Sequence, residues 1–193
     1  MADTWGEVDF SQLVALRDRL VELEKKSDAF MKECTDELCA RLLAKVKKRT
    51  PVWEKTKLLN HLKNIKGTKL KVKKTSEDSD FSEEAMQIYR EHWAGHVGGF
   101  LRKSWQPVAA RKIGSFFVAV LNNGAKYALY VEKGHRQQPG RFVPALGVRL
   151  KANWVPGYHM LRISEDELRR EMDSILQRKQ NEWLKKAMGG VMD

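Results

Sequence analysis

A single apolar stripe runs through the first quarter of the chain and sets the strongest constraint on its fold. Apolar side chains recur at steps of three, four or seven residues from Leu13 to Val46. This spacing places them on one face of an α-helix. The stripe predicts an amphipathic helix over about Gln12 to Lys48, longer than an ordinary globular helix, with a break near Lys26-Ser27-Asp28. Pro51 disfavours a helical conformation for the residue before it, so we expect the helix to stop there.

The segment most typical of a strand is Ile113–Leu121, which is rich in β-branched and aromatic residues. Alternation along a strand places Phe117, Ala119 and Leu121 on one face and Phe116, Val118 and Val120 on the other. Because both faces are apolar, we expect this strand to be covered on two sides. Asn122-Asn123-Gly124 then has the residue types of a tight turn.

The remaining elements are predicted less sharply. The spacing of Tyr127, Tyr130 and Val131 suits a short helical turn or a packed extended segment, and Gly134 permits a sharp exit. Trp53–Gly98 is the least regular part of the chain, and we expect a helix over Thr56–Lys66, an edge strand or hairpin arm over Lys69–Lys74, and a helix from Ser82 to about Trp93.

The last third of the chain is predicted to form a loop, a strand and a helix, in that order. Two prolines and a glycine in His135–Pro144 predict a long exposed loop. Val148–Val155 is expected to form a strand. Ser164, with Glu167 three residues later, forms a capping box, which predicts the start of the final helix there.

Charge and cysteine content limit the classes of function that this protein can have. The 36 basic and 25 acidic residues give a formal net charge of +11, which admits nucleic acid, an acidic protein partner or a solvated basic surface. Cys34 and Cys39 do not share a helix face, and we expect free thiols in a reducing compartment. No segment has the apolar run of a signal peptide or of a membrane span. We therefore expect a soluble protein, made in a cytoplasm and without a membrane partner.

The residue patterns of common catalytic and metal sites are not met. His92 and His96 stand one helical turn apart, but Trp93 occupies the place where zinc peptidases need a glutamate. No Cys-x-x-Cys pair, Gly-x-Ser-x-Gly elbow or phosphate-binding glycine loop occurs. We predict that the protein is not an enzyme and that it holds no metal or cofactor.

Three motifs, in order, resemble one known family. They are Thr50-Pro51-Val52, then Gly99-Phe100-Leu101-Arg102-Lys103-Ser104 followed by Trp105, and Tyr127-Ala128-Leu129-Tyr130-Val131-Glu132-Lys133-Gly134. Together they resemble the neck or tail-completion family of long-tailed bacteriophages, which are minor structural proteins of the head–tail junction. The family brings the first two motifs together, so we interpret residues 53–98 as an insertion within a single domain spanning 1–193.

The resemblance implies an α+β fold in which a small antiparallel sheet packs against a long N-terminal helix and a C-terminal helix. It also implies a virion protein of the neck or tail, in a tail-completion or tail-terminator role. Copies would form a homo-oligomeric ring, expected to be a hexamer, that contacts head-closure and tail-tube or terminator proteins and surrounds passing DNA. On this hypothesis the candidates for subunit interfaces or a DNA-facing lumen are Arg102, Lys103, Arg136, Gln137, Arg141 and Phe142.

A second hypothesis depends on charge and aromatic content alone. Basic side chains together with stacking aromatic rings are typical of nucleic-acid-binding proteins. The six tryptophans include Trp93, Trp105 and Trp183, whose spacing also suits a core. Lysine and arginine are spread from Arg17 to Lys186, whereas nucleic-acid-binding proteins usually concentrate them. A stand-alone nucleic-acid-binding protein is therefore the alternative to a virion component.

Overall fold

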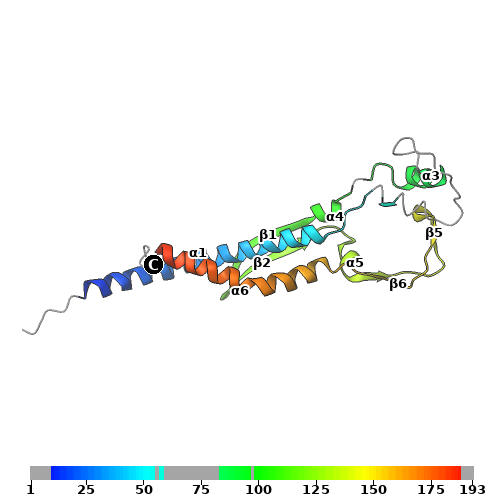
Figure 1. Cartoon of the computed structure of the whole chain (residues 1–193). Coiled ribbons are helices and arrows are strands. Elements are labelled where there is room, and N and C mark those ends of the chain that lie inside the picture. Colours follow the sequence, from blue (N-terminus) through cyan, green and yellow to red (C-terminus); the bar gives the residue numbers. More distant parts are fainter. Residues whose placement is uncertain (1–9, 55–56, 59–82, 97, 188–193) are drawn as a thin grey trace, which may run out of the picture. The chain divides into compact units, whose positions relative to one another are not determined.

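The computed structural model describes residues 10–54, 57–58, 83–96 and 98–187. Its helices are α1 (Ser11–Arg49), α3 (Glu83–His92), α4 (Phe100–Lys103), α5 (Ala128–Lys133) and α6 (Met160–Ala187), with a short 3-10 helix, η1 (Pro144–Leu146). Its strands are β1 (Trp105–Ile113), β2 (Phe116–Asn123), β3 (Gly134–Arg136), β4 (Phe142–Val143), β5 (Val148–Arg149) and β6 (Trp154–Pro156). The strands pair as β1-β2, β3-β6 and β4-β5 (Figure 1). The predicted α+β class, with a long N-terminal helix, small antiparallel sheets and a C-terminal helix, is confirmed.

The chain divides into two compact units. The first, called here the helical unit, comprises Met1–Leu43, Pro107–Leu121 and Glu165–Asp193. The second, the arm unit, comprises Ala44–Gln106 and Asn122–Ser164. Four elements, α1, α6, β1 and β2, contribute residues to both units. The predicted helix over Thr56–Lys66 and edge strand over Lys69–Lys74 lie almost wholly outside the described residues.

In the helical unit, α1 and α6 run antiparallel and hold each other through stacked rings and a charged network. Phe30 on α1 stacks on Trp183 of α6, with ring centroids 4.5 Å apart. Lys179 of α6 donates to Glu33 at 2.9 Å and bonds Glu37 at 2.6 Å, both on α1. Because α1 is continuous from Ser11 to Arg49, the break expected near Ser27 is wrong.

The two cysteines lie in this helical pair. Cys34 and Cys39 are both buried and both free. Burial raises the pKa of each thiol above its ordinary value. The expected free thiols are therefore confirmed.

Strands β1 and β2 form a hairpin that packs against α1. The backbone N–H of Ala110 donates to the Asp36 carboxylate at 2.6 Å. Phe117, Ala119 and Leu121, with part of Val118, line a cleft of about 290 Å³, whose other walls come from α1 and from Leu168 of α6. The single strand predicted over Ile113–Leu121 is wrong at its start, because Gly114, with a φ of 60°, makes the hairpin turn there. The residues before this turn form β1, a strand that we did not predict.

The other face of β2 is exposed. Phe116, Val118 and Val120 are 75%, 37% and 43% exposed. The expectation that both faces of this strand are covered is therefore wrong for a single chain. Both faces of the strand are apolar, as predicted, but composition does not say which neighbouring element covers each face.

In the arm unit, residues 134–156 form a two-stranded antiparallel arm. At its base Gly134 pairs with Pro156 and Arg136 with Trp154, and further out Phe142 pairs with Arg149. Backbone hydrogen bonds continue the pairing between these short strands, from Gln137 N to Asn153 O at 2.9 Å and from Leu150 N to Arg141 O at 2.8 Å. The predicted long loop over His135–Pro144 is thus one side of a paired arm. The predicted strand over Val148–Val155 is divided between β5 and β6.

The tip of the arm is bound to α3. The indole Nε1 of Trp93 donates to the Ala145 carbonyl of η1 at 2.7 Å. Trp53 stacks on Trp93 with ring centroids 5.9 Å apart, and Leu146 packs on the cluster formed by Leu58 and Ala85. Helix α3 confirms the helix expected from Ser82 to Trp93. The described part of the predicted 53–98 insertion is therefore packed against the arm.

The final helix begins one turn before its predicted start. Helix α6 begins at Met160, and Ser164 lies within it, fully buried, with its hydroxyl donating to the Met160 carbonyl at 2.6 Å. The capping box predicted at Ser164 is therefore wrong, because the helix receives its N-terminal cap from another element.

Candidate interaction site

The motif residues meet at one buried junction in the arm unit. Thr50 follows the last turn of α1 and is fully buried. Its hydroxyl donates to the Val46 carbonyl at 2.7 Å and accepts the indole N–H of Trp105 at 2.9 Å. Its carbonyl accepts two hydrogen bonds from the Arg102 guanidinium, at 2.7 and 3.3 Å. The first and second motifs thus bind each other directly, although about fifty residues separate them.

The third motif binds the start of α6. Both carboxylate oxygens of Glu132 accept backbone N–H groups, from Leu161 at 3.0 Å and from Arg162 at 3.1 Å. A carboxylate at a helix N-terminus satisfies unpaired N–H groups and favours the positive end of the helix dipole. Glu132 is therefore the N-terminal cap of α6, in place of the predicted Ser164.

Gly134 closes the same motif with a backbone conformation that side chains disfavour. Its φ is 83°, and a Cβ there would lie 2.3 Å from the Val155 carbonyl oxygen. Gly157 meets the chain from the other side, where a Cβ would lie 2.2 Å from the Glu132 carbonyl oxygen. The two glycines let the base of the arm close tightly against the end of α5. Within the arm unit, the motifs therefore join the end of α1 to α4 and the start of β1, and join α5 to the start of α6 and the base of the arm.

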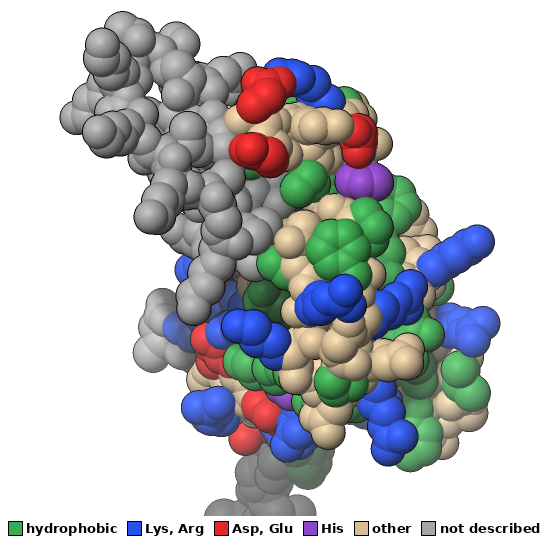
Figure 2. Space-filling model, turned by 90° about the vertical axis from the view of Figure 1, so that its right-hand side faces the viewer, with side chains coloured by type: hydrophobic (Ala, Val, Ile, Leu, Met, Phe, Trp, Pro, Cys, Tyr) green, Lys and Arg blue, Asp and Glu red, His purple; other side chains and the backbone are tan. Residues whose placement is uncertain are grey.

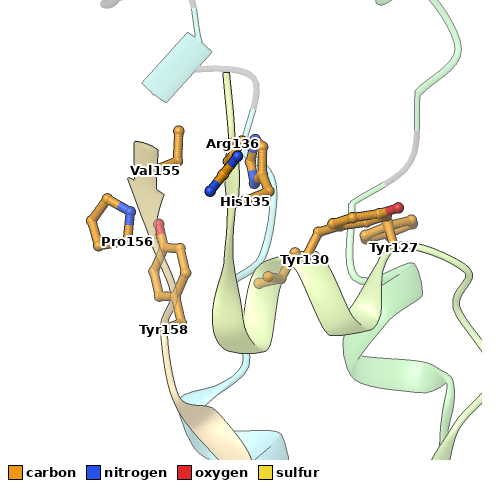
Figure 3. A pocket seen from close by; sticks show the side chains of 8 residues that line it. Tyr127, Tyr130, His135, Arg136, Val155, Pro156 and Tyr158 are labelled. Carbon is orange, nitrogen blue, oxygen red and sulfur yellow. The ribbon is translucent and has the colours of Figure 1, made fainter. Parts of the chain in front are cut away.

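An open groove of about 600 Å³ lies beside the base of the arm (Figure 3). Its lining is aromatic and apolar, and the residues are Tyr127, Tyr130, Val131, His135, Arg136, Val155, Pro156 and Tyr158. Tyr127 and Tyr130 come from the α5 segment, His135 and Arg136 from β3, and Tyr158 from beyond β6 (Figure 3). No lining residue is a carboxylate or a thiol. An apolar groove with a few polar groups is the usual form of a binding site.

The predicted interface residues fall into two groups. Arg136, Gln137, Arg141 and Phe142 all lie on one side of the arm, where Arg136, Arg141 and Phe142 are exposed. Arg102 lies on α4, and its guanidinium already binds the Thr50 carbonyl. Lys103, beside it, is exposed. The arm thus gathers four of the six candidates, whereas Arg102 has an internal partner at the motif junction.

Sequence reasoning missed the other side of the arm. Arg149 is exposed beside Phe142, with its guanidinium carbon 5.9 Å from the ring centroid, and Lys151 is exposed two residues later. Trp154, opposite Arg136, is 48% exposed. A signal was present in the sequence, because no acidic residue occurs between Lys133 and Ser164. On one face of the molecule, Lys and Arg side chains stand among exposed apolar ones (Figure 2).

Two searches of the described residues concern other kinds of site. No group of three or more His, Cys, Asp or Glu side chains capable of holding a metal ion occurs in residues 10–54, 57–58, 83–96 and 98–187. Within the same ranges, no helix combines the length and the apolar character required to cross a bilayer.

Comparison with models of known protein families finds a match. Residues 15–83 match the model of the HK97-gp10-like family, described as "Bacteriophage HK97-gp10, putative tail-component". The match is consistent with the neck and tail-completion resemblance. It includes Thr50-Pro51-Val52 but ends before the other two motifs, so it supports the resemblance largely through different residues. No curated protein and no solved structure matches the chain.

Proposed function

We propose, from the match of residues 15–83 to a bacteriophage tail-component family, that this chain is a structural virion protein of the head–tail junction. Its role would be that of a neck, tail-completion or tail-terminator protein. Copies would assemble into a ring, expected to be a hexamer, that joins or caps the tail. Head-closure and tail-tube or terminator proteins would be its neighbours.

The observation that carries the ring is the exposed outer face of β2. Phe116, Val118 and Val120 form an apolar face on the helical unit, and large apolar side chains in such a row mark an interaction surface. A second apolar surface lies on the first turns of α1, where Leu13, Leu16 and Leu20 are 61%, 38% and 53% exposed. The stripe becomes buried at Leu23, which lies beside Ala187 of α6. The start of α1 therefore has no such cover in the described part of the chain.

A rotational ring requires two different, complementary surfaces on each subunit. The two apolar surfaces of the helical unit meet this requirement, and they cannot cover each other within one chain. Helix α1 is unbroken, and its residues near Leu38 lie against the inner face of the hairpin. The hairpin extends along α1 as far as Asp28, which is paired with Lys112. Leu20 stands on the order of 12 Å further along the same helix, at about 1.5 Å per residue, and the outer face of β2 lies on the side of the hairpin away from α1. We infer that the α1 stripe of one subunit packs on the β2 outer face of the next.

Within such a ring, the arm and the groove at its base are left for other partners. Lys103, Arg136, Gln137, Arg141 and Phe142 remain the candidates for contacts with adjacent rings or with DNA in a lumen. Arg102 is a weaker candidate because its guanidinium binds the Thr50 carbonyl.

The experiment is to measure the mass of the purified protein by light scattering and to image it by negative-stain electron microscopy. We expect rings for the unmodified protein and monomers for Val120→Lys, because a buried unpaired lysine would disrupt the apolar contact. The matched control is Ile163→Lys, which adds the same charge at a residue that is 45% exposed on α6 and outside both surfaces. A protein that stays monomeric at every concentration and binds no virion component would count against the proposal.

A further inference from the structure

The positive charge of this protein is concentrated in one segment. Residues 133–164 hold six lysines and arginines and no aspartate or glutamate, so they supply +6 of the net charge of +11. The rest of the chain has 30 basic and 25 acidic residues, which nearly balance. The broad spread of lysine and arginine along the sequence hides this difference, because elsewhere acidic residues accompany them.

The structure places four of these cations along the two sides of the arm. Arg136, Arg141, Arg149 and Lys151 are all exposed. Of the five N–H donors of Arg149, one binds the Gly140 carbonyl at 2.9 Å, which leaves others for a ligand. The nearest acidic residue in sequence, Glu132, caps α6 through both of its oxygens. The cations along the strands are therefore not neutralised by an acidic residue of the arm itself.

Helix α3, which holds the tip, adds acidic side chains at that end. These are Glu83, Glu84 and Glu91. Glu83 is paired with Arg90 of the same helix at 2.9 Å, and Gln87 donates to Glu91 at 2.9 Å. The cationic surface is thus the length of the arm between its base and η1, and its tip is closer to neutral.

The arrangement of these charges fits a polymeric anion. Arg136 and Arg141 lie on one side of the arm, with a turn at Pro139-Gly140 between them, and Arg149 and Lys151 lie on the opposing side. Double-stranded DNA carries about one negative charge per 1.7 Å of helix axis. A two-stranded β-ribbon also has the width that the DNA major groove admits. An acidic protein surface, in contrast, seldom offers a continuous row of one sign, because the cores of protein interfaces are depleted in charge.

We propose that the arm, residues 133–158, binds double-stranded DNA through its phosphates. Arg136, Arg141, Arg149 and Lys151 contact the backbone, and the apolar rings between them lie against the groove. This binding does not depend on the ring, because each arm is formed within one chain. It differs from the lumen predicted from the sequence, since it includes Arg149 and Lys151 and leaves out Arg102.

The test is a binding titration of the full-length protein with a labelled DNA duplex, at about 50 and 200 mM salt. The arm variant is R136Q/R141Q/R149Q/K151Q. The matched control is K25Q/R169Q/R178Q/K186Q, which removes the same charge from exposed positions of the helical unit. We expect the arm variant to lose at least about tenfold in affinity and about 3.6 units of the salt slope, because each of the four phosphate contacts contributes about 0.9 to that slope. The control should stay within about threefold of the unmodified protein, because exposed charges beyond a Debye length are screened.

A third variant distinguishes the loss of phosphate contacts from misfolding of the arm. R136K/R141K/R149K keeps the charge and should keep most of the affinity, whereas a variant that merely misfolds the arm would lose it. Equal losses in the arm variant and the control would overturn the proposal, because net charge alone would then explain binding. Tighter binding to a single strand than to the duplex, or equal competition by polyglutamate, would also overturn it.

The same variants separate this proposal from the ring. An arm variant that forms rings but does not bind DNA supports both. Arm-dependent DNA binding by a protein that forms no rings supports the arm and rejects the ring. Rings that bind no DNA in the unmodified protein reject the arm alone.

Discussion

The indole N–H of Trp105 donates a hydrogen bond of 2.9 Å to the hydroxyl of Thr50, and both residues are buried. This bond joins the end of α1 to the start of β1. We expect Thr50→Val to destabilise the protein by about 1–3 kcal/mol, because valine keeps the shape but leaves the buried indole N–H without a partner. Chemical denaturation followed by tryptophan fluorescence measures the change.

Thr35→Val is the matched control for that substitution. Thr35 lies on the same helix, and its hydroxyl donates only to the Met31 carbonyl one turn back, in an exposed position. Its replacement should change the free energy of unfolding by no more than about 0.5 kcal/mol. Equal effects of the two substitutions would show that the Thr50–Trp105 hydrogen bond contributes no more to the free energy of unfolding than the Thr35–Met31 bond does.

Glu132 should be required for the stability of α6. We expect Glu132→Ala to cost about 1 kcal/mol, because the N–H groups of Leu161 and Arg162 lose their acceptors and the helix dipole loses a favourable charge. Thermal unfolding by circular dichroism measures this loss. Glu24→Ala removes the same side chain from an exposed position in the middle of α1 and should be nearly neutral. A neutral Glu132→Ala would contradict the assignment of Glu132 as the cap.

Alanine substitutions at two glycines of similar conformation distinguish the cost of backbone strain from the cost of a steric clash. Gly134 and Gly140 have φ values of 83° and 84°, but only at Gly134 would a Cβ meet other atoms. We expect Gly140→Ala to cost about 1 kcal/mol, from the left-handed conformation alone. Gly134→Ala should cost about 3 kcal/mol or more, because the new Cβ overlaps the Val155 carbonyl and forces β3 away from β6.

Hydrogen exchange of the arm amides provides the second measurement for this pair. Loss of protection across β3 and β6 in Gly134→Ala, with protection retained in Gly140→Ala, is the expected result. Similar exchange in both variants would mean that the close approach at the base of the arm does not limit its stability.

The charged network between α1 and α6 should make stability depend on pH. Hydrogen bonds from Lys179 and then from Arg41 lower the pKa of Glu37. A carboxyl whose pKa is lower in the folded protein stabilises it above the ordinary value of 4.5, and this contribution is lost as the pH falls through the folded value. The unmodified protein should therefore lose stability as the pH falls below 4.5, as measured by denaturation at each pH.

Lys179→Met isolates the source of that dependence. Lys179 is the largest cause of the Glu37 shift, so its removal should reduce the loss on acidification, while lowering stability near pH 7 by roughly 1 kcal/mol. Lys186→Met, at an exposed position near the described end of α6, should leave the pH profile unchanged. An unchanged profile in Lys179→Met would show that other groups control the acid response.

Local patterns predicted the helices better than the turns. The tight turn predicted at Asn122-Asn123-Gly124 is wrong, because Asn122 and Asn123 are the last residues of β2. The stripe from Leu13 to Val46 predicted both ends of α1 to within one residue, apart from the break that does not occur. The spacing near Tyr130 left a helical turn and an extended segment open, and the structure has the helix, α5. These elements depend on contacts between residues three and four apart, which the sequence displays directly. The positive φ of Gly134 also follows from a local need, since glycine is the residue that tolerates it.

Pairing between distant segments could not be predicted from local sequence patterns. The hairpin turn at Gly114 was hidden inside an apolar run, so a single strand was predicted where two occur. The cap of α6 was assigned to Ser164 because that residue begins a local capping pattern, whereas Glu132 competes for the helix terminus from 28 residues before Met160. No period in the sequence marks an interaction of this kind.

The candidate site shows the same division. The sequence named Arg136, Gln137, Arg141 and Phe142 because they stand in one Pro-containing and Gly-containing segment. Arg149 and Lys151 join them only through the antiparallel register that pairs Phe142 with Arg149. Arg102 was named for its charge, and only the fold reveals that the Thr50 carbonyl already accepts its hydrogen bonds.

Because the two thiols of α1 are buried, a cysteine introduced elsewhere in the protein can be labelled selectively. The chain has two cysteines, and the raised pKa of each keeps it in the unreactive thiol form near neutral pH. A new cysteine at an exposed position of the arm, such as Gln138, would therefore react with maleimide dyes well before the native ones. A fluorophore placed there could report arm contacts in the otherwise unaltered protein.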